Sequence, residues 1–255
     1  MVTKQSLIAN LKQQLEPLDY VYALWLEGSD ANGTADAYSD IDLWADVADE
    51  KEQEAIASVE SALRGIAPFD FCHIMTHGHP KIRQRIYHLA GTDPYLMIDF
   101  CWQLHSRPRD SYSFDPDDTI ETARVIFDKD DVIRFCPRDP LSFAAANQAL
   151  MSDMTYRMAQ HIRVVKYVKR GLFPEAFAAY GQYVLEPLVA LLRVIHTPAH
   201  TDYGLLHISN HLPQDLAARL AFFVKVGSLS EIEDKTAWAK TWFDELKAII
   251  DRTET

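Results

Sequence analysis

The pattern of apolar residues divides this chain into two parts. The first part mixes helical and strand-like periods, and the second part is helical almost throughout. The first part alternates helical and strand-like patterns, beginning with an amphipathic segment near 4–16 that is stopped by Pro17. Two strand-like runs follow, both rich in β-branched or aromatic residues: YVYALWLEG and DIDLWADV. This alternation predicts that helices and strands share one domain in the first part of the chain.

The alternation continues to about residue 106. Residues 50–65 predict a helix with Asp49 as its N-cap, Glu52 completing a capping box and Gly65 as its C-terminal stop. The stretch FDFCHIMTH predicts another strand. The stretch KIRQRIYHLAGTDPYLMIDFCWQLHS has a period of two on either side of the turn residues GTDP, which predicts a hairpin.

Beyond Pro140 the apolar period becomes helical almost throughout. We predict one long helix over 141–171 and another over 174–198 that is bent near Pro187. Ser230 and Glu233 form a capping-box pattern at the start of the last helix. The second part of the chain is therefore expected to be a helical bundle.

The boundary between the two patterns is polar and contains prolines. We divide the chain into a mixed domain at 1–115, a linker with a short hairpin around DKDD at 116–140, and a helical domain at 141–255. The expected fold class is α+β, with a mixed β-sheet flanked by helices followed by an all-α bundle.

Composition limits the classes of partner. Of the 255 residues, 25 are Lys or Arg and 37 are Asp or Glu, and the resulting net charge of -12 argues against nucleic acid or an anionic membrane as partner. We also expect no stretch long enough to span a bilayer and no signal peptide. The three cysteines fit a reducing compartment, so the expected location is the cytoplasm.

The strand-like run DIDLWADV begins with two alternating carboxylates, Asp40 and Asp42, where a buried strand is expected. Residues i and i+2 of a strand face the same side, so Asp40 and Asp42 point together, and two adjacent carboxylates repel each other unless a cation lies between them. Magnesium prefers oxygen ligands and leaves room for substrate phosphates. Gly28 and Ser29 end the preceding strand, where a missing Cβ and a hydroxyl would suit a phosphate.

A Gly-Ser pair followed at this spacing by Asp-x-Asp resembles the polymerase-β-like nucleotidyltransferase superfamily, which includes the minimal, aminoglycoside and lincosamide nucleotidyltransferases. The resemblance covers roughly the first 105 residues, and the helical half resembles the bundles of the antibiotic-modifying members. It implies that Gly28 and Ser29 bind a nucleoside triphosphate and that Asp40 and Asp42 bind magnesium. It also implies a third acid on a nearby strand, which joins the metals or takes the acceptor's proton.

Two residues compete for the role of the third acid. Asp99 interrupts the apolar strand YLMIDFCW, where an ionised carboxylate is costly unless a cation or a proton partner meets it. Asp70 in FDFCHI lies close to a strand start, where solvent can serve it. We favour Asp99 as the catalytic acid and third metal ligand, and Asp70 stays open as the rival.

Two groups of basic residues are candidates for neutralising the triphosphate. Period-two spacing places Arg83 on one side of a strand with Lys81 and Arg85, and helical spacing places Lys166 on one face with Arg163 and Arg170. Each group has an alternative explanation, a solvated edge strand for the first and a solvated helix face for the second. A zinc site in CHIMTHGH is disfavoured, because Cys72 and His73 point to opposite faces of a strand.

The resemblance and these patterns together imply a nucleotidyltransferase that uses two magnesium ions. It would move a nucleoside monophosphate, expected to be AMP from ATP, to a hydroxyl of a small-molecule acceptor such as an aminoglycoside-like antibiotic, with release of pyrophosphate. The alternative is an antitoxin-like or degenerate protein that keeps the fold in a regulatory or binding role. The intact Gly28, Ser29, Asp40 and Asp42 argue against degeneration.

Overall fold

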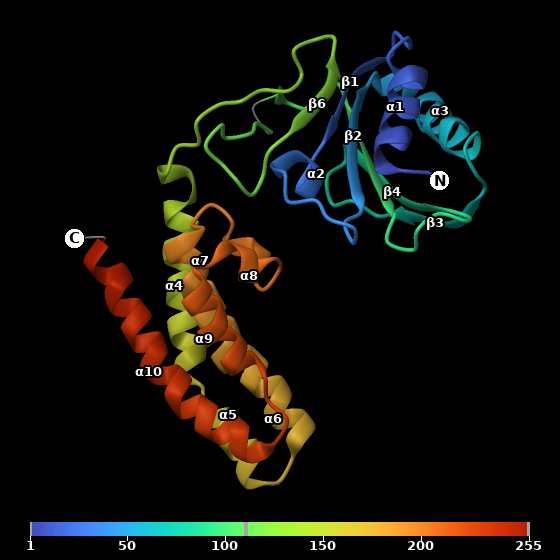
Figure 1. The fold of residues 1–255 in the computed structure, drawn as a ribbon. Helices are drawn as coiled ribbons and strands as arrows, with labels where there is room; N and C mark the ends of the chain where they lie inside the picture. Colours follow the sequence, from blue (N-terminus) through green and yellow to red (C-terminus); the bar gives the residue numbers. More distant parts are fainter. Residues whose placement is uncertain (1, 110–111, 254–255) are drawn as a thin grey trace. The chain divides into compact units, whose positions relative to one another are not determined.

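The computed structural model describes residues 2–109 and 112–253, which fold into two compact units (Figure 1). The first unit is Met1–Arg138 and the second is Asp139–Thr255. The first holds the mixed sheet and the second consists of helices, so the expected α+β class is confirmed.

The first unit is built on a six-stranded sheet with the order β3-β4-β5-β2-β1-β6. Only the central pair β2 and β5 is parallel, while every other neighbouring pair is antiparallel. The predicted hairpin at GTDP is confirmed as the connection from β4 to β5. The strands are β1 Val21–Leu26, β2 Ile41–Val47, β3 Phe69–Met75, β4 Ile82–Leu89, β5 Ile98–Leu104 and β6 Arg124–Asp128.

Two helices, α1 Lys4–Leu15 and α3 Glu52–Arg64, lie on one side of this sheet (Figure 1). The apolar stripe of α1 is fully buried against the alternate apolar residues of the central strands, because leucines four residues apart share one face of a helix. We call this side the helix-covered face. It buries the larger core of the first unit. The other face of β2 and β5 carries the acids Asp42, Asp46 and Asp99 together with Trp44, Cys101 and Gln103.

The other face of β1 is covered by the segment that follows β5. Ala23 and Trp25 pack there against Val132 and Ile133. This segment differs from the predicted hairpin, because β6 pairs with β1 at the edge of the sheet and no second strand follows β6 among the residues that the structure describes. The Asp128 carboxylate accepts hydrogen bonds from the backbone N–H groups of Val132 (3.0 Å) and Ile133 (2.9 Å), which turns the chain after β6.

The N-cap expected for α3 is also wrong. Residues Asp49–Lys51 form a 3₁₀ turn before the helix, and the Asp49 carboxylate accepts hydrogen bonds from the backbone N–H (3.0 Å) and hydroxyl of Ser106. A partner 57 residues away in sequence thus replaces the local cap, because Asp49 lies where β2 and β5 both end.

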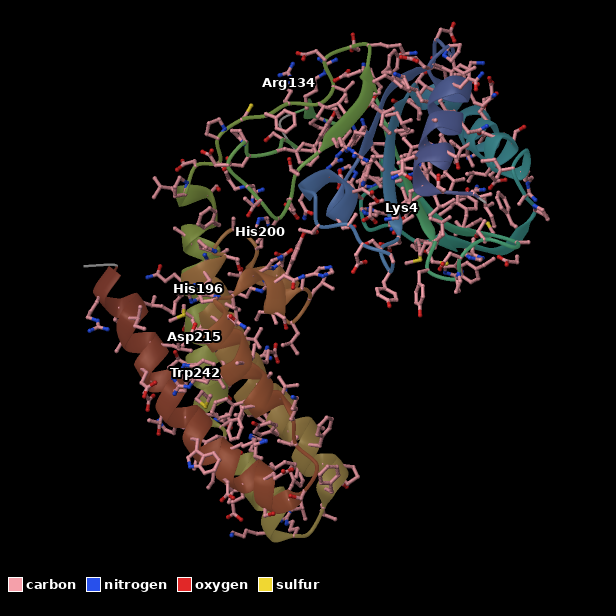
Figure 2. All side chains as sticks on the ribbon, viewed as in Figure 1. Lys4, Arg134, His196, His200, Asp215 and Trp242 are labelled. Carbon is pink, nitrogen blue, oxygen red and sulfur yellow. The ribbon has the colours of Figure 1, made fainter. Side chains whose placement is uncertain are left out.

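The second unit is a bundle of helices, as expected, whose core includes Trp242 (Figures 1 and 2). The predicted long helix is broken at Gln160 and His161, where 3₁₀-type bonds from Gln160 N–H to Arg157 and from His161 N–H to Met158 close the first helix. The helices are α4 Leu141–Ala159, α5 Ile162–Lys169, α6 Phe173–Tyr180, α7 Glu186–His196, α8 Ile208–His211, α9 Gln214–Val224 and α10 Leu229–Thr253.

The predicted bend near Pro187 takes the form of a π-helical stretch, Gly181–Leu185, between α6 and α7. Proline lacks an N–H, so the helical ladder shifts just before it. The continuous stretch Phe173–His196 is long and apolar enough to cross a membrane, contrary to the sequence expectation. In the 18-residue window that passes this test, 56% of the residues are buried, and core helices of bundles pass the same test of length and composition.

The cap of α10 lies two residues earlier than predicted. The hydroxyl of Ser228 accepts a hydrogen bond from the N–H of Glu231 (3.2 Å), and the carboxylate of Glu231 reaches back to the N–H of Gly227 (2.6 Å). The sequence contains two overlapping capping-box patterns, Ser228 with Glu231 and Ser230 with Glu233, and the structure uses the first rather than the predicted second.

Candidate functional site

The parallel pair β2 and β5 brings two carboxylates side by side. Asp42 of β2 and Asp99 of β5 are direct partners in the strand register, so their side chains leave the same face of the sheet. Asp40 precedes β2 by one residue and is exposed. This face is opposite to the helix-covered face, because Ile41 and Ile98 beside the two acids point into the helix-packed core.

Negative charge dominates around Asp42. Burial, and then the neighbouring Asp40, Asp99 and Asp30, raise the pKa of Asp42 to about 6, while Lys4 acts in the opposite direction. No described residue donates a hydrogen bond to the Asp42 side chain. Lys4, at the start of α1 (Figure 2), instead pairs with Asp30 (2.9 Å) and donates to the backbone carbonyl of Asp40 (2.7 Å).

Asp99 is held by a residue that the sequence analysis did not single out. The side-chain amide of Gln84 on β4 lies 2.9 and 2.8 Å from the two carboxylate oxygens of Asp99 and donates to them. Burial nevertheless raises the pKa of Asp99, and the amide only partly offsets it. The signal available in the sequence was that Gln84 alternates with Arg83 and Arg85, so it must face the opposite side of β4 from them.

Gly28 and Ser29 lie directly against Asp42. They begin the short helix α2 Gly28–Asn32 after β1, and Gly28 has a φ of +59°. A Cβ at Gly28 would lie 2.1 Å from an Asp42 carboxylate oxygen, so any other residue there would have to displace that carboxylate. The Ser29 hydroxyl is buried and has no hydrogen-bond partner among the described residues. The Gly-Ser pair therefore leaves one polar group unsatisfied beside the acids.

Two further groups adjoin the acids and were also missed. Glu27 precedes Gly28, accepts a hydrogen bond from the indole N–H of Trp25 (2.9 Å), and has its pKa raised to about 7, chiefly by burial. Cys101 lies two residues after Asp99 on the same face, and burial followed by the charge of Asp99 raises the pKa of its thiol. The sequence offered one signal for each: Glu27 directly precedes Gly28 in LEGS, and Cys101 follows Asp99 by two residues in DFC.

The rival acid Asp70 lies elsewhere on the sheet. It belongs to β3, which is separated from β5 by β4. Its carboxylate lies 2.6 Å from Nδ1 of His88 and its side chain is half exposed. The structure thus brings Asp99, and not Asp70, together with Asp42, while the chemical role of Asp99 stays a prediction.

Arg83 does not join the acids, which corrects the expected role in triphosphate binding. It faces Trp102 of β5 on the helix-covered face, opposite to Asp99. There its guanidinium pairs with Glu52 of α3 (2.9 Å), and Arg85 pairs in the same way with Glu60 (2.5 Å). The shared side of these cations was predicted correctly, but that side is covered by α3.

Lys166 lies on α5 in the second unit, where it is exposed. Arg163, which shares the predicted stripe, has contacts within the second unit: its guanidinium donates to Gln160 (2.9 Å) and lies over the ring of Tyr183. The expected contact of Lys166 with phosphates stays a prediction.

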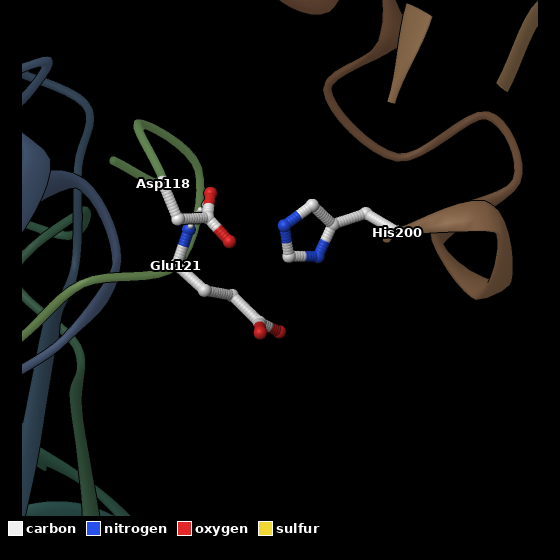
Figure 3. Close-up of side chains that lie close together, drawn as sticks. All are labelled: Asp118, Glu121 and His200. Atoms are coloured by element: carbon white, nitrogen blue, oxygen red, sulfur yellow. Dashed lines mark hydrogen bonds between the residues drawn. The ribbon is translucent and has the colours of Figure 1, made fainter. Parts of the chain in front are cut away.

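A second pair of acids, Asp118 and Glu121, shares a turn of the first unit (Figure 3). One Asp118 oxygen accepts from the N–H groups of Ile120 (2.8 Å) and Glu121 (3.2 Å), and the Arg138 guanidinium lies 3.9 and 3.5 Å from the two carboxylates. His200, the third residue drawn, belongs to the second unit. Unlike Asp42, these acids have a nearby guanidinium.

Asp40, Asp42 and Asp99 do not form a closed cage of metal ligands. Within the described part of the first unit, no three His, Cys, Asp or Glu side chains each place a ligand atom within 4.8 Å of the others. The donor set is nevertheless all oxygen, and Lys4, the cation recorded beside it, pairs with Asp30 rather than with Asp42 or Asp99. Such a set suits a magnesium ion that keeps some of its waters. The unpartnered Ser29 hydroxyl and the glycine beside Asp42 are consistent with a phosphate next to that ion.

No protein-family model matches this chain, and no curated protein matches it. Among solved structures, it is similar to an aminoglycoside 6-adenyltransferase from Bacillus subtilis, with 12% identity over 97% of this chain and 92% of that chain and a TM-score of 0.37. It is also similar to spectinomycin adenyltransferase AAD(9) from Enterococcus faecialis, solved with ATP and spectinomycin, with 12% identity over 95% and 100% of the two chains and a TM-score of 0.36.

Both names are those of adenyltransferases. Similarities at TM-scores below 0.5 assign no ligand, residue role or reaction to this chain.

Proposed function

We propose that this protein is a magnesium-dependent nucleotidyltransferase that moves AMP from ATP to a hydroxyl of a small-molecule acceptor and releases pyrophosphate. One observation carries the proposal: Asp42 and Asp99 are register partners on adjacent parallel strands, and no described residue donates a hydrogen bond to the Asp42 side chain. Carboxylates gathered in this way are costly without a cation.

The residues of this face have distinct roles in the proposal. Asp40, Asp42 and Asp99 hold magnesium, which neutralises charge on the triphosphate and its leaving group. Ser29 donates its hydroxyl to a phosphate oxygen, and Gly28 lets the phosphate and Asp42 approach without a Cβ between them.

Asp99 is the third ligand or the base that takes the proton from the acceptor hydroxyl. Gln84 donates to both of its oxygens, which fixes the orientation of the carboxylate. The net charge of -12 favours a cationic acceptor, and an aminoglycoside-like amine fits that charge. The exposed free thiols of Cys72 and Cys136 fit a reducing cytoplasm.

The experiment is product formation from α-labelled nucleoside triphosphates with a panel of hydroxyl-bearing acceptors, with and without magnesium. We expect a labelled acceptor and pyrophosphate only when magnesium is present. Calorimetry in a chelator should show weakened triphosphate binding, and equally tight binding there would overturn the metal assignment. Binding of triphosphate without any product would instead favour the degenerate, regulatory alternative.

The assignment of the third acid is tested by two variants. Asp99→Asn should abolish transfer and leave the fold intact, because its one amide oxygen still accepts from Gln84 but the amide can neither ligate a cation well nor take a proton. Asp70→Asn is the matched control on the same sheet and should retain transfer. The reverse result would show that Asp70 is the functional acid.

A further inference from the structure

The outer edge of the sheet is an apolar strand. β3 lies at the end of the strand order, and β4 is its only neighbour among the described strands. Every residue of β3 after Phe69 is exposed, and the apolar ones have large exposed fractions: 47% for Phe71, 63% for Ile74 and 37% for Met75. Proteins usually protect such an edge with charges, proline or a covering element, because its free N–H and C=O groups can pair with another strand.

Charged residues, the commonest protection of an edge strand, are missing from β3 after Asp70. Residues 71–80 contain no Asp, Glu, Lys or Arg, although the chain as a whole has a net charge of -12. Two copies of the chain repel each other electrostatically, and this repulsion is weakest where the facing surfaces carry no charge. The uncharged edge is therefore the part of the first unit best suited to meet a second copy.

The register within the strand defines how such a pair would form. The pairing of β3 with β4 shifts between Phe69 and Phe71, and from Phe71 to Met75 it is regular. His73 is the centre of this regular segment. A two-fold axis perpendicular to the sheet at His73 would place each strand antiparallel to its copy without changing the face of any side chain.

This register matches apolar residues with apolar residues. Phe71 and Met75 lie on one face of β3 and would oppose each other across the axis, since both are two residues from His73. Cys72 and Ile74 lie on the other face and would oppose each other in the same way. Asp70, the nearest charge, falls outside the paired segment.

We propose that β3 pairs antiparallel with β3 of a second copy of this chain, with His73 opposite His73, so that the two sheets become continuous. The paired segment is short compared with a standard protein interface, so the dimer forms in a concentration-dependent equilibrium with the monomer. The inference does not depend on the proposed catalytic activity, because it uses neither the acids nor the Gly-Ser pair.

The first test is sedimentation velocity of the full chain over a wide concentration range. Wild type should shift from monomer to dimer, and Ile74→Lys should raise the dissociation constant by at least about tenfold, because it brings two charges close to the axis. Ile162→Lys is the matched control: Ile162 is 62% exposed on α5 and the change in net charge is the same. Circular dichroism checks that both variants are folded.

The second test reads the register. In a background with Cys72→Ser and Cys136→Ser, His73→Cys should form a disulfide-linked dimer, since directly opposed residues lie within disulfide range. His77→Cys, also exposed, should not, because it would lie on the order of 25 Å from its copy. A monomer at all concentrations, a dimer insensitive to Ile74→Lys, larger assemblies, or crosslinking of His77→Cys alone would overturn the proposal.

Discussion

Strand β2 carries one carboxylate near each end, and their surroundings differ. Asp46 is fully buried and accepts hydrogen bonds from the side-chain amide of Gln103 (2.6 Å) and from Nδ1 of His105 (2.6 Å). Asp42, four residues earlier on the same face, is partly exposed and accepts no side-chain hydrogen bond from any described residue. Its nearest charges are mostly acids.

The difference separates a structural carboxylate from a candidate ligand. Burial raises the pKa of both groups, but at Asp46 the bonds from Gln103 and His105 act against that rise. His105 in turn lies 3.2 Å from Asp130, so the Asp46 end ties β2 to the segment after β5. Burial alone therefore does not identify a site, whereas buried negative charge without protein partners does.

The largest effect on activity is expected at the Asp42 end of β2, where the carboxylate has no hydrogen-bond partner among the described residues. Asp42→Asn should lower transfer by at least about a hundredfold, because it removes a charged oxygen from the proposed magnesium site. Melting temperature should stay the same or rise slightly, since repulsion from Asp40 and Asp99 is relieved. Steady-state kinetics and thermal melting measure the two effects, and a large loss of stability would assign Asp42 to the fold instead.

At the Asp46 end of β2, a substitution should reduce stability rather than activity. Asp46→Ala should lower the free energy of unfolding by about 3 kcal/mol, because it leaves the buried Gln103 amide and His105 without their acceptor. Urea denaturation measures this, with Asp42→Ala as the control on the same strand face. If the two alanine variants lost equal stability, the distinction between the two ends would be wrong.

Gly28 offers a smaller and more specific perturbation. Gly28→Ala should cost about 1 to 2 kcal/mol of stability through its positive φ and the clash with Asp42, and it should also impair transfer by displacing that carboxylate. Gly33→Ala separates the two causes, because Gly33 also has a positive φ (+81°) but a Cβ there would meet nothing within 4 Å. Equal transfer rates in the two variants would contradict the contact with Asp42.

The smallest effect is expected at Asp70. The backbone carbonyl of Asp93, followed by the Asp70 carboxylate, raises the pKa of His88. A histidine with a raised folded pKa stabilises the protein fully below its unfolded pKa, about 6.5, and this contribution is lost as pH rises through the folded pKa. Asp70→Asn should therefore lower the pKa of His88 in an NMR titration and reduce melting temperature slightly under acidic conditions only. A pKa of His88 that did not change would exclude the pairing.

Local sequence determined most of the elements. The strands, the hairpin at GTDP and the amphipathic α1 were predictable because apolar period, turn residues and caps act over a few positions. The same period predicted that Asp40 and Asp42 share one face, and it correctly grouped Arg83 with Arg85 on one side of β4. These predictions needed no knowledge of which strand lies next to which.

Tertiary structure decided what the local patterns left open. A period of two shows that side chains share a face, but only the packing of α1 and α3 shows which face is covered, and this turned Arg83 toward Glu52. Strand order alone placed Asp99 beside Asp42 and Asp70 at the edge. The pairing of β6 with β1 and the hydrogen bond from Ser106 to Asp49 join residues far apart in sequence. Such contacts leave no local signal in the sequence, because they form only when the sheet has assembled.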